Sequence, residues 1–273
     1  MSIIAISRGT FSGGEALAKD VAERLGYRCV SREVILEAAE RYGFPVEELV
    51  AAMEKRPPLW ERLVGKRTAY LICMRAALCD RAQKEPLVYH GYLGHFLLPG
   101  IAHVLRVRVI ADMEFRIQAA VQQQQLARKE AMAYIEKVDK ERRQWTRFLF
   151  DVAWDDPHLY DVVLNLGRMS LAAACETVVH LAAQPEFTPT VASLKAMQDL
   201  ALISRVAAAC ARDPRTRDAN LEVIADDGIV TVSGTTQSPV VMEAVPLVAR
   251  QVGGVKDVRV EVRFLREGSG SSA

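Results

Sequence analysis

Apolar residues follow two different spacings along the first two thirds of the chain, and the spacing decides which element each segment predicts. Short runs that are nearly all apolar are typical of strands buried on both faces of a sheet. They occur at residues 3–7, 87–90, 104–110 and 162–165. Between them, apolar residues recur at helical spacing, at residues 14–25, 32–42, 66–83, 114–125, 129–150 and 170–183. Strands that alternate with helices predict an α/β fold of three layers, a parallel sheet between two layers of helices.

The pattern changes near residue 184. The segment from Gln184 to Thr190 holds two prolines and two threonines, which is typical of a linker. Beyond it, two β-branched runs flank Asp226-Asp227-Gly228, a strong hairpin signal. Helices are expected at 195–211 and 238–252, the latter capped by glycine at 253–254, and strands at 221–225, 229–234 and 258–264. We therefore predict a first domain at 1–185, a linker at 186–197, a small α/β domain at 198–266 and a flexible tail at 267–273.

Charge and cysteine content narrow the classes of partner. The 273 residues include 35 Lys and Arg against 34 Asp and Glu, so bulk electrostatics favours neither nucleic acid nor an anionic membrane. The five cysteines form no C-x-x-C pair and the first residues do not resemble a signal peptide, so we expect a cytoplasmic protein. The uncharged stretch 87–105 is divided by Gly91, Gly94 and Pro99-Gly100, which predicts strand, short helix and strand rather than a membrane span.

A glycine-rich loop follows the first predicted strand, and it reads Gly9-Thr10-Phe11-Ser12-Gly13-Gly14-Glu15-Ala16. It fits the G-x-x-x-x-G part of a phosphate-binding loop. Such a loop continues with a Lys for the outer phosphates and a Ser or Thr for Mg²⁺. Here Glu15 and Ala16 stand at those positions. The helix N-terminus still favours an anion, whereas a carboxylate repels one. A strand-to-helix turn that binds nothing is the alternative interpretation.

Several separated segments add a resemblance to a known family. Four parts of the sequence carry this resemblance. They are the opening strand and loop, the segment from Leu105 to Arg116, the run Val138-Asp139-Lys140-Glu141-Arg142, and Trp154 with Asp156-Pro157, Tyr160-Asp161 and Asn165. Together they make residues 1 to about 183 resemble the cytidylate kinase-like branch of the P-loop nucleoside monophosphate kinases. The resemblance implies transfer of phosphate from ATP, with Mg²⁺, to CMP or a related monophosphate. Such chemistry depends on positioning and on cations.

The resemblance also implies a set of site residues. Those implied to bind nucleotide or phosphate are Arg8, Gly9, Ser12, Gly13, Gly14, Arg32 and Arg116. Those implied to be catalytic are Asp139, Arg142 and Arg143. Two further positions depart from the family pattern, since Ser31 replaces an acidic residue and Tyr92 an arginine. These losses predict impaired transfer.

Some of these residues have plainer interpretations. Arg142 and Arg143 also fit a solvated helix face, while Asp156 and Asp161 fit turn and cap chemistry around Pro157. Arg106 and Arg108 share one face of their strand and either support loops or reach solvent. His90 and His95 lack helical i, i+4 spacing and accompanying ligands, so no metal site is predicted.

Residues 198 to about 266 resemble a BON domain, a small α/β module. The likeness is carried by the run 199–206, by Leu221-Glu222-Val223, by the segment from Gly228 to Gly234, and by 249–262. The resemblance implies binding to phospholipid or another surface. Nine basic and ten acidic residues at 198–273 do not support attraction to a membrane, so docking of a protein partner or self-association is the alternative.

The sequence thus leaves three functional hypotheses open. The first is a domain that binds a nucleotide or a phosphate-containing small molecule with impaired phosphoryl transfer, joined to a BON domain that docks or senses. The second is an active CMP-type kinase that uses ATP and Mg²⁺. The third is a scaffold that binds no small molecule.

Overall fold

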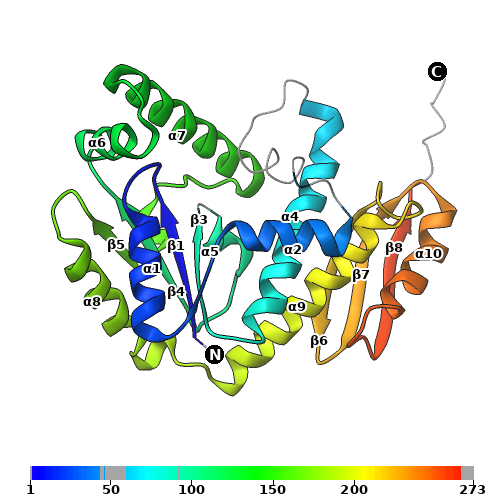
Figure 1. Cartoon of the computed structure of the whole chain (residues 1–273). Coiled ribbons are helices and arrows are strands. Elements are labelled where there is room, and N and C mark those ends of the chain that lie inside the picture. The colour runs from blue at the N-terminus through cyan, green and yellow to red at the C-terminus, as the bar shows by residue number, and fades with distance from the viewer. Residues whose placement is uncertain (1, 44–45, 47–59, 92, 266–273) are drawn as a thin grey trace.

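The computed structural model describes residues 2–43, 46, 60–91 and 93–265 (Figure 1). In the first region, five strands make one parallel sheet: β1 (Ile3–Arg8), β2 (Arg28–Val30), β3 (Leu87–Gly91), β4 (Val104–Ile110) and β5 (Val162–Asn165). The helices described there are α1 (Gly14–Leu25), α2 (Arg32–Tyr42), α4 (Trp60–Ala82), α5 (Gly94–Leu97), α6 (Met113–Gln124), α7 (Arg128–Phe150) and α8 (Leu171–Ala182). The predicted α/β architecture is confirmed.

Strand order in this sheet is β2-β3-β1-β4-β5, so β1 lies at the centre. Its residues alternate between the two faces, as a strand requires. Ile3 and Ala5 belong to the buried cluster that α2, α4 and α5 cover, whereas Ile4 and Ile6 belong to the cluster that α1 and α8 cover. The apolar pattern predicted four of the five strands. It missed β2, which has three residues and begins with an exposed arginine, too few for a period to be read.

The uncharged stretch 87–105 also forms what its glycines predicted. It contains β3, α5 and the start of β4, all largely buried. None of the described helices combines the length with the hydrophobicity that a membrane-spanning segment needs.

A second, smaller sheet follows. Strands β6 (Asn220–Asp226) and β7 (Ile229–Thr236) pair antiparallel, and β8 (Asp257–Phe264) lies parallel to β7 after the crossover helix α10 (Pro239–Arg250). Asp227 and Gly228 both have positive φ, 48° and 88°, which confirms the predicted tight hairpin. The predicted glycine cap of α10 is wrong, because the helix ends earlier and its C-cap is Gln251 with φ −77°.

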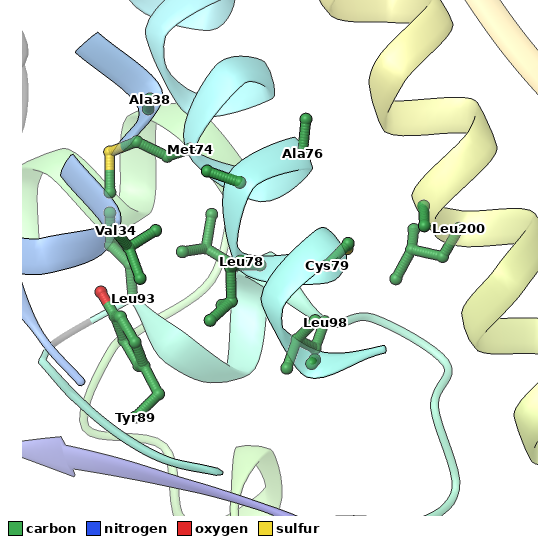
Figure 2. Packing of buried hydrophobic residues seen from close by; sticks show 14 of the residues in the cluster. Val34, Ala38, Met74, Ala76, Leu78, Cys79, Tyr89, Leu93, Leu98 and Leu200 are labelled. Atoms are coloured by element: carbon green, nitrogen blue, oxygen red, sulfur yellow. The ribbon is translucent and has the colours of Figure 1, made fainter. Parts of the chain in front are cut away.

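The helix α9 (Val191–Arg212) joins the two regions and contributes to both cores. Met197, Leu200 and Ala208 belong to the same buried cluster as α4 of the first sheet. Val206 and Cys210 belong to the core of the second sheet. Figure 2 shows Leu200 on α9 facing the turn of α4 that carries Ala76 and Cys79. One face of α9 is therefore a further layer over α4, and the predicted division between 185 and 198 runs into a helix that both cores share.

Charged and polar side chains also stabilise the packing of α9 on the first region. Asp80 of α4 is nearly buried and pairs with Arg41 of α2 and with Arg205 of α9, the latter at 3.4 Å. On the other side, His103 Nδ1 lies 2.8 Å from Ser193 Oγ near the start of α9. The packing of α9 on the first region is thus both apolar and polar.

Candidate functional site

The glycine-rich loop connects β1 to α1 at the carboxyl edge of the sheet. Two of its glycines are required by close packing. A Cβ on Gly14 would lie 2.6 Å from Arg8 Cβ, and one on Gly13 would lie 2.8 Å from Leu166 Cδ1, while Gly13 also has φ +83°. Phe11 has a positive φ of 57°, which is strained for an L-residue. The loop thus has the tight turn that its glycines predicted.

Many of the polar groups in this loop are used within the protein. Gly9 N donates to Val109 O at 3.3 Å, and Ser12 N donates to Gly9 O at 3.2 Å. The buried Ser12 hydroxyl donates to backbone as well, at 3.0 Å from Gly9 O. Ser12 therefore ties the loop together.

Glu15, at the position of the usual lysine, forms two ion pairs. Its carboxylate lies 3.0 Å from Lys19 Nζ and 3.7 Å from Arg8 Nη2. The hydrogen bond from Lys19, helped by the charge of Arg8 and opposed by partial burial, lowers the pKa of the Glu15 carboxyl. Glu15 is therefore an anion at neutral pH, and it neutralises the loop's nearest arginine.

Residues of α6 and α7 close over the loop. Asp139 accepts hydrogen bonds from Thr10 Oγ1 at 2.9 Å and from Arg116 Nη2 at 2.5 Å. Arg116 also donates to Thr10 O at 2.7 Å, and Arg142 donates to Thr10 Oγ1 at 3.1 Å. Phe11 packs against the small apolar cluster of the two helices. We call residues 8–15 with Arg116, Asp139 and Arg142 the loop–lid region.

The structure brings together most of the residues that the sequence singled out. Those within this region or beside it are Arg8, Gly9, Ser12, Gly13, Gly14, Arg116, Asp139 and Arg142. Arg143 is exposed on α7, which agrees with its plainer interpretation as part of a solvated helix face. The side chain of Arg32 and the whole of Tyr92 lie outside the described residues. Asp156 caps the short 3₁₀ turn Pro157–Leu159, and Asp161 accepts from Arg106 N at 2.7 Å, so both have the turn and loop roles expected of them.

A second polar group at the sheet edge was missed by sequence reasoning. Arg108 on β4 is 6% exposed; it donates to Ser7 Oγ at 3.2 Å and its guanidinium lies 3.7 Å from the Trp154 ring centroid. Tyr160 lies 3.3 Å from the same Ser7 oxygen. The only signal in the sequence was the placement of Arg106 and Arg108 on one face of the strand. That signal does not say which arginine is buried.

Two buried histidines flank these groups. Burial lowers the pKa of His90 to about 4 and that of His95 to about 3, so both are neutral at pH 7. The charges of Arg8 and Glu15 act on His90, whereas those of Arg108 and Arg106 act on His95. The histidines therefore belong to different sides of the site.

The loop offers Mg²⁺ fewer ligands than a usual phosphate-binding loop does. Ala16 supplies no hydroxyl, and the Asp139 carboxylate accepts hydrogen bonds from Arg116 and Thr10. Mg²⁺ is usually held by one or two protein oxygens, by waters and by the phosphates of the substrate. The usual hydroxyl ligand is therefore the one that this loop lacks.

Comparison with known proteins bears on the same region. Residues 3–168 match the model of the cytidylate kinase-like family, and residues 198–266 match that of the BON domain. A cytidylate kinase from Ignicoccus hospitalis is 28% identical over 65% of this chain and 97% of its own length. A cytidylate kinase from Archaeoglobus fulgidus is 26% identical over 64% of this chain and 92% of its own length.

A solved structure resembles the fold. An uncharacterized protein from Eubacterium ventriosum matches with a TM-score of 0.52 and 20% identity, covering 67% of this chain and 98% of its own. The matched family model spans more than half of the chain, and the parallel sheet with its loop agrees with it. The chain therefore belongs to the cytidylate kinase-like family and carries a BON domain after its kinase-like part.

Proposed function

We propose that the kinase-like domain binds a nucleotide or another phosphate-containing small molecule with impaired phosphoryl transfer, and that the BON domain docks or senses. The observation that carries this proposal is Glu15. It takes the position of the loop lysine and forms ion pairs with Arg8 and Lys19. A loop whose nearest cation is already neutralised attracts a triphosphate less strongly than a loop that ends in lysine.

The ion pair of Arg116 with Asp139 also supports impaired transfer. One arginine that stabilises a phosphoryl transition state is worth about 10³- to 10⁵-fold in rate. Arg116 is held by Asp139 at 2.5 Å, with 12% and 11% of the two side chains exposed. For transfer, Arg116 would have to leave Asp139, or to bind the phosphate of the substrate while still bound to Asp139. Binding is less demanding, since backbone N–H groups at the start of α1 favour an anion without side-chain cations.

The proposal is tested by two measurements on the full chain. Calorimetric titration with ATP, CMP and CDP measures binding, and an ADP-release assay with the common nucleoside monophosphates measures transfer. We expect heat from at least one nucleotide and turnover far below the roughly 1–100 s⁻¹ of working kinases. No heat with any of them at millimolar ligand overturns the proposal.

An active CMP-type kinase is the second candidate, and the relatives favour it because both are named cytidylate kinase. Arg142 reaches the loop and would be its catalytic cation. Under this candidate, ATP with Mg²⁺ is the phosphate donor and turnover is lost in Arg142→Ala. The neighbouring Arg143→Ala is the matched control. Turnover that depends on Arg142 and not on Arg143 would replace the first proposal with this one.

For the BON domain we propose a docking role. The exposed strand β8 and helix α10 leave a surface for a protein partner or a second copy of the chain. Light scattering on the full chain distinguishes self-association from a monomer. A cytoplasmic location stays part of this proposal.

A further inference from the structure

Three neighbouring strands present one row of residues at the carboxyl edge of the sheet. Ser7 of β1 is in register with Gly91 of β3 on one side and with Arg108 of β4 on the other. The face involved is the one that α4 and α5 cover, opposite to α1. In open parallel sheets, ligands bind outside the carboxyl ends of the strands. Arg108 is thus at the edge where a ligand is expected, but on the other face from the helix that follows the loop.

Ser7 fixes the Arg108 side chain. Its oxygen accepts from Arg108 Nη1 and from Trp154 Nε1, each at 3.2 Å. Tyr160 uses its own hydrogen on Trp154 O at 2.8 Å, so the Ser7 hydroxyl donates to Tyr160. The guanidinium lies over the Trp154 ring, in cation–π contact at 3.7 Å. Because a guanidinium has five N–H donors, this arrangement orients Arg108 and leaves donors for a ligand.

Arg108 forms no ion pair within the described part of the protein, although the charges of Asp139 and Asp155 act on it from a greater distance. It is 6% exposed, yet none of the ion pairs among the described residues includes it. Arg106, two residues earlier on the same face, pairs with Asp161 at 4.0 Å. Buried charges in proteins are normally paired, because desolvation without a partner costs several kcal/mol. A buried arginine that no carboxylate contacts, beside an edge where ligands bind, points to an anion from outside.

Two more side chains nearby have unused polar atoms. Arg75 of α4 donates to Phe96 O at 3.5 Å, and its buried Nε has no partner in the described structure. Both ring nitrogens of His95 are buried without a partner there as well. His95 lies 4.8 Å from Tyr160 and 3.8 Å from Phe96 between ring centroids, so contacts connect all three cationic or imidazole groups. We call Ser7, Arg75, His95, Arg108, Trp154 and Tyr160 the Arg108 cluster.

We propose that the Arg108 cluster binds the oxyanion of a phosphate monoester, with Arg108 as its main ligand. The planar guanidinium of Arg108 matches two oxygens of a phosphate at once, and a dianion pairs with its charge more strongly than a singly charged carboxylate does. Neutral His95 adds a hydrogen-bond donor or acceptor, and Trp154 holds Arg108 in place. This inference deepens the proposed function and rests on it in one respect, namely that a nucleotide supplies the phosphate monoester. Inorganic phosphate is the other source of the same anion.

Titration of the full chain with inorganic phosphate and with CMP tests the site. We expect saturable binding of phosphate to the wild-type protein and a loss of about 10- to 100-fold in Arg108→Gln, the usual range for a hydrogen bond to a charged group. Arg108→Lys keeps the charge and is expected to recover part of the affinity. The matched control is Arg106→Gln, on the same strand and face, which should leave affinity within about twofold. CMP that binds more tightly than phosphate, with the same dependence on Arg108, identifies the nucleotide as the source.

A second measurement observes Arg108 directly in the wild-type protein and uses a variant only for assignment. In wild-type protein labelled with ¹⁵N-arginine, phosphate should shift the Nε–Hε resonance of Arg108, assigned with the Arg108→Lys protein. A purely supporting role for Arg108 leaves this resonance unchanged. Absence of phosphate and CMP binding, or binding unaffected by Arg108→Gln, overturns the inference.

An ATP titration separates this inference from the proposed function. If ATP binds and the Arg108 variants leave phosphate and CMP affinity unchanged, the inference fails while the proposed function stands. If inorganic phosphate binds through Arg108 while no nucleotide binds, the anion site stands and the proposed function fails.

Discussion

The loop–lid region and the Arg108 cluster lie along the same edge of one sheet, yet they balance their charges in opposite ways. In the loop–lid region, Arg8 pairs with Glu15 and Arg116 pairs with Asp139. In the Arg108 cluster, Arg108 is buried and Arg75 half-buried, and no described carboxylate forms an ion pair with either of them. A protein whose 35 basic and 34 acidic residues nearly cancel therefore contains one site whose arginines are held in ion pairs and one site whose arginines are not.

This difference shows that an arginine in the sequence does not by itself predict an anion site, because its partners in the fold decide whether it can bind an anion. A paired arginine must leave its carboxylate before it can bind a phosphate, whereas a buried unpaired arginine gains a partner when the phosphate arrives. The two regions also differ in what covers them. The helix α4, which carries Arg75, is itself covered by α9 of the BON side, whereas α1 is flanked by α8 of the same domain.

The largest effect is expected from removing that cover. A chain ended after Thr190 loses Met197, Leu200 and Ala208 from the core beside α4. It also loses Arg205 from Asp80. At about 1.5–3 kcal/mol for each large side chain, roughly 5 kcal/mol of burial is lost, comparable to the whole stability of many domains. We expect this chain to lack a cooperative unfolding transition in urea.

The matched control for that truncation is a chain ended after Leu265, which retains α9 and all the described strands. Its unfolding midpoint should equal that of the full protein. If the chain ended after Thr190 also unfolds at the midpoint of the full protein, α9 does not stabilise the first core. The α4 face of the sheet would then not depend on α9, and the comparison with the α1 face would fail.

Asp139→Asn tests whether the loop–lid region can be made like the Arg108 cluster. It leaves Arg116 without its carboxylate in a setting where 12% of that side chain is exposed. Breaking a buried pair costs about 3 kcal/mol. We expect that loss in urea unfolding, together with recovery when phosphate is added, since an anion can replace the carboxylate. Glu136→Gln removes an exposed carboxylate from the same helix and is the control; equal phosphate effects in both variants would contradict the argument.

Lowering the pH should reduce the stability of the protein through two buried histidines, one beside each region. The folded pKa values of His90 and His95, about 4 and about 3, lie below the unfolded value of 6.5. The unfolded chain therefore binds more protons below pH 6.5, and stability falls as pH is lowered from there toward the folded pKa. Between pH 7 and pH 5 each histidine contributes a loss of about 2 kcal/mol.

The His90→Phe and His95→Phe variants sharpen the comparison. Each should lose about 2 kcal/mol less than the wild type over this interval, measured by urea unfolding at both pH values. Saturating phosphate beside Arg108 should raise the pKa of His95 and reduce its part of the loss, leaving that of His90 unchanged. An equal effect of phosphate on both histidines would place the anion elsewhere.

Much of this fold could be predicted because its strands are buried on both faces. Runs such as 3–7 and 104–110 are mostly apolar without a period, as central strands of a parallel sheet are. The altered loop was also visible, since Glu15 and Ala16 are adjacent to the glycines. The double role of α9 had a signal that was not used: Leu200, Leu202 and Val206 are apolar on more than one face of the helix.

The burial of Arg108 could not be predicted from the same evidence of spacing. Arg106 and Arg108 share one face of β4, and local sequence treats them alike. Their difference comes from distant residues, because Asp161 pairs with Arg106 while Trp154 covers Arg108. Partners of this kind, about 50 residues away in the chain, are fixed by tertiary packing rather than by local pattern.

The smallest effect on stability is expected from Glu15→Lys, which restores a cation to the loop. Glu15 has 51% of its side chain exposed, and exposed ion pairs contribute about 0–1 kcal/mol, so urea unfolding should change little. The affinity for ATP should rise about tenfold, because a carboxylate that repels phosphate becomes a hydrogen-bond donor. Glu23→Lys, near the other end of α1, makes the same change in net charge and should leave ATP affinity unaltered. Equal gains in both variants would show bulk charge at work, whereas a gain confined to Glu15→Lys means that the loop is neutralised by that single residue and still has the shape to bind phosphate.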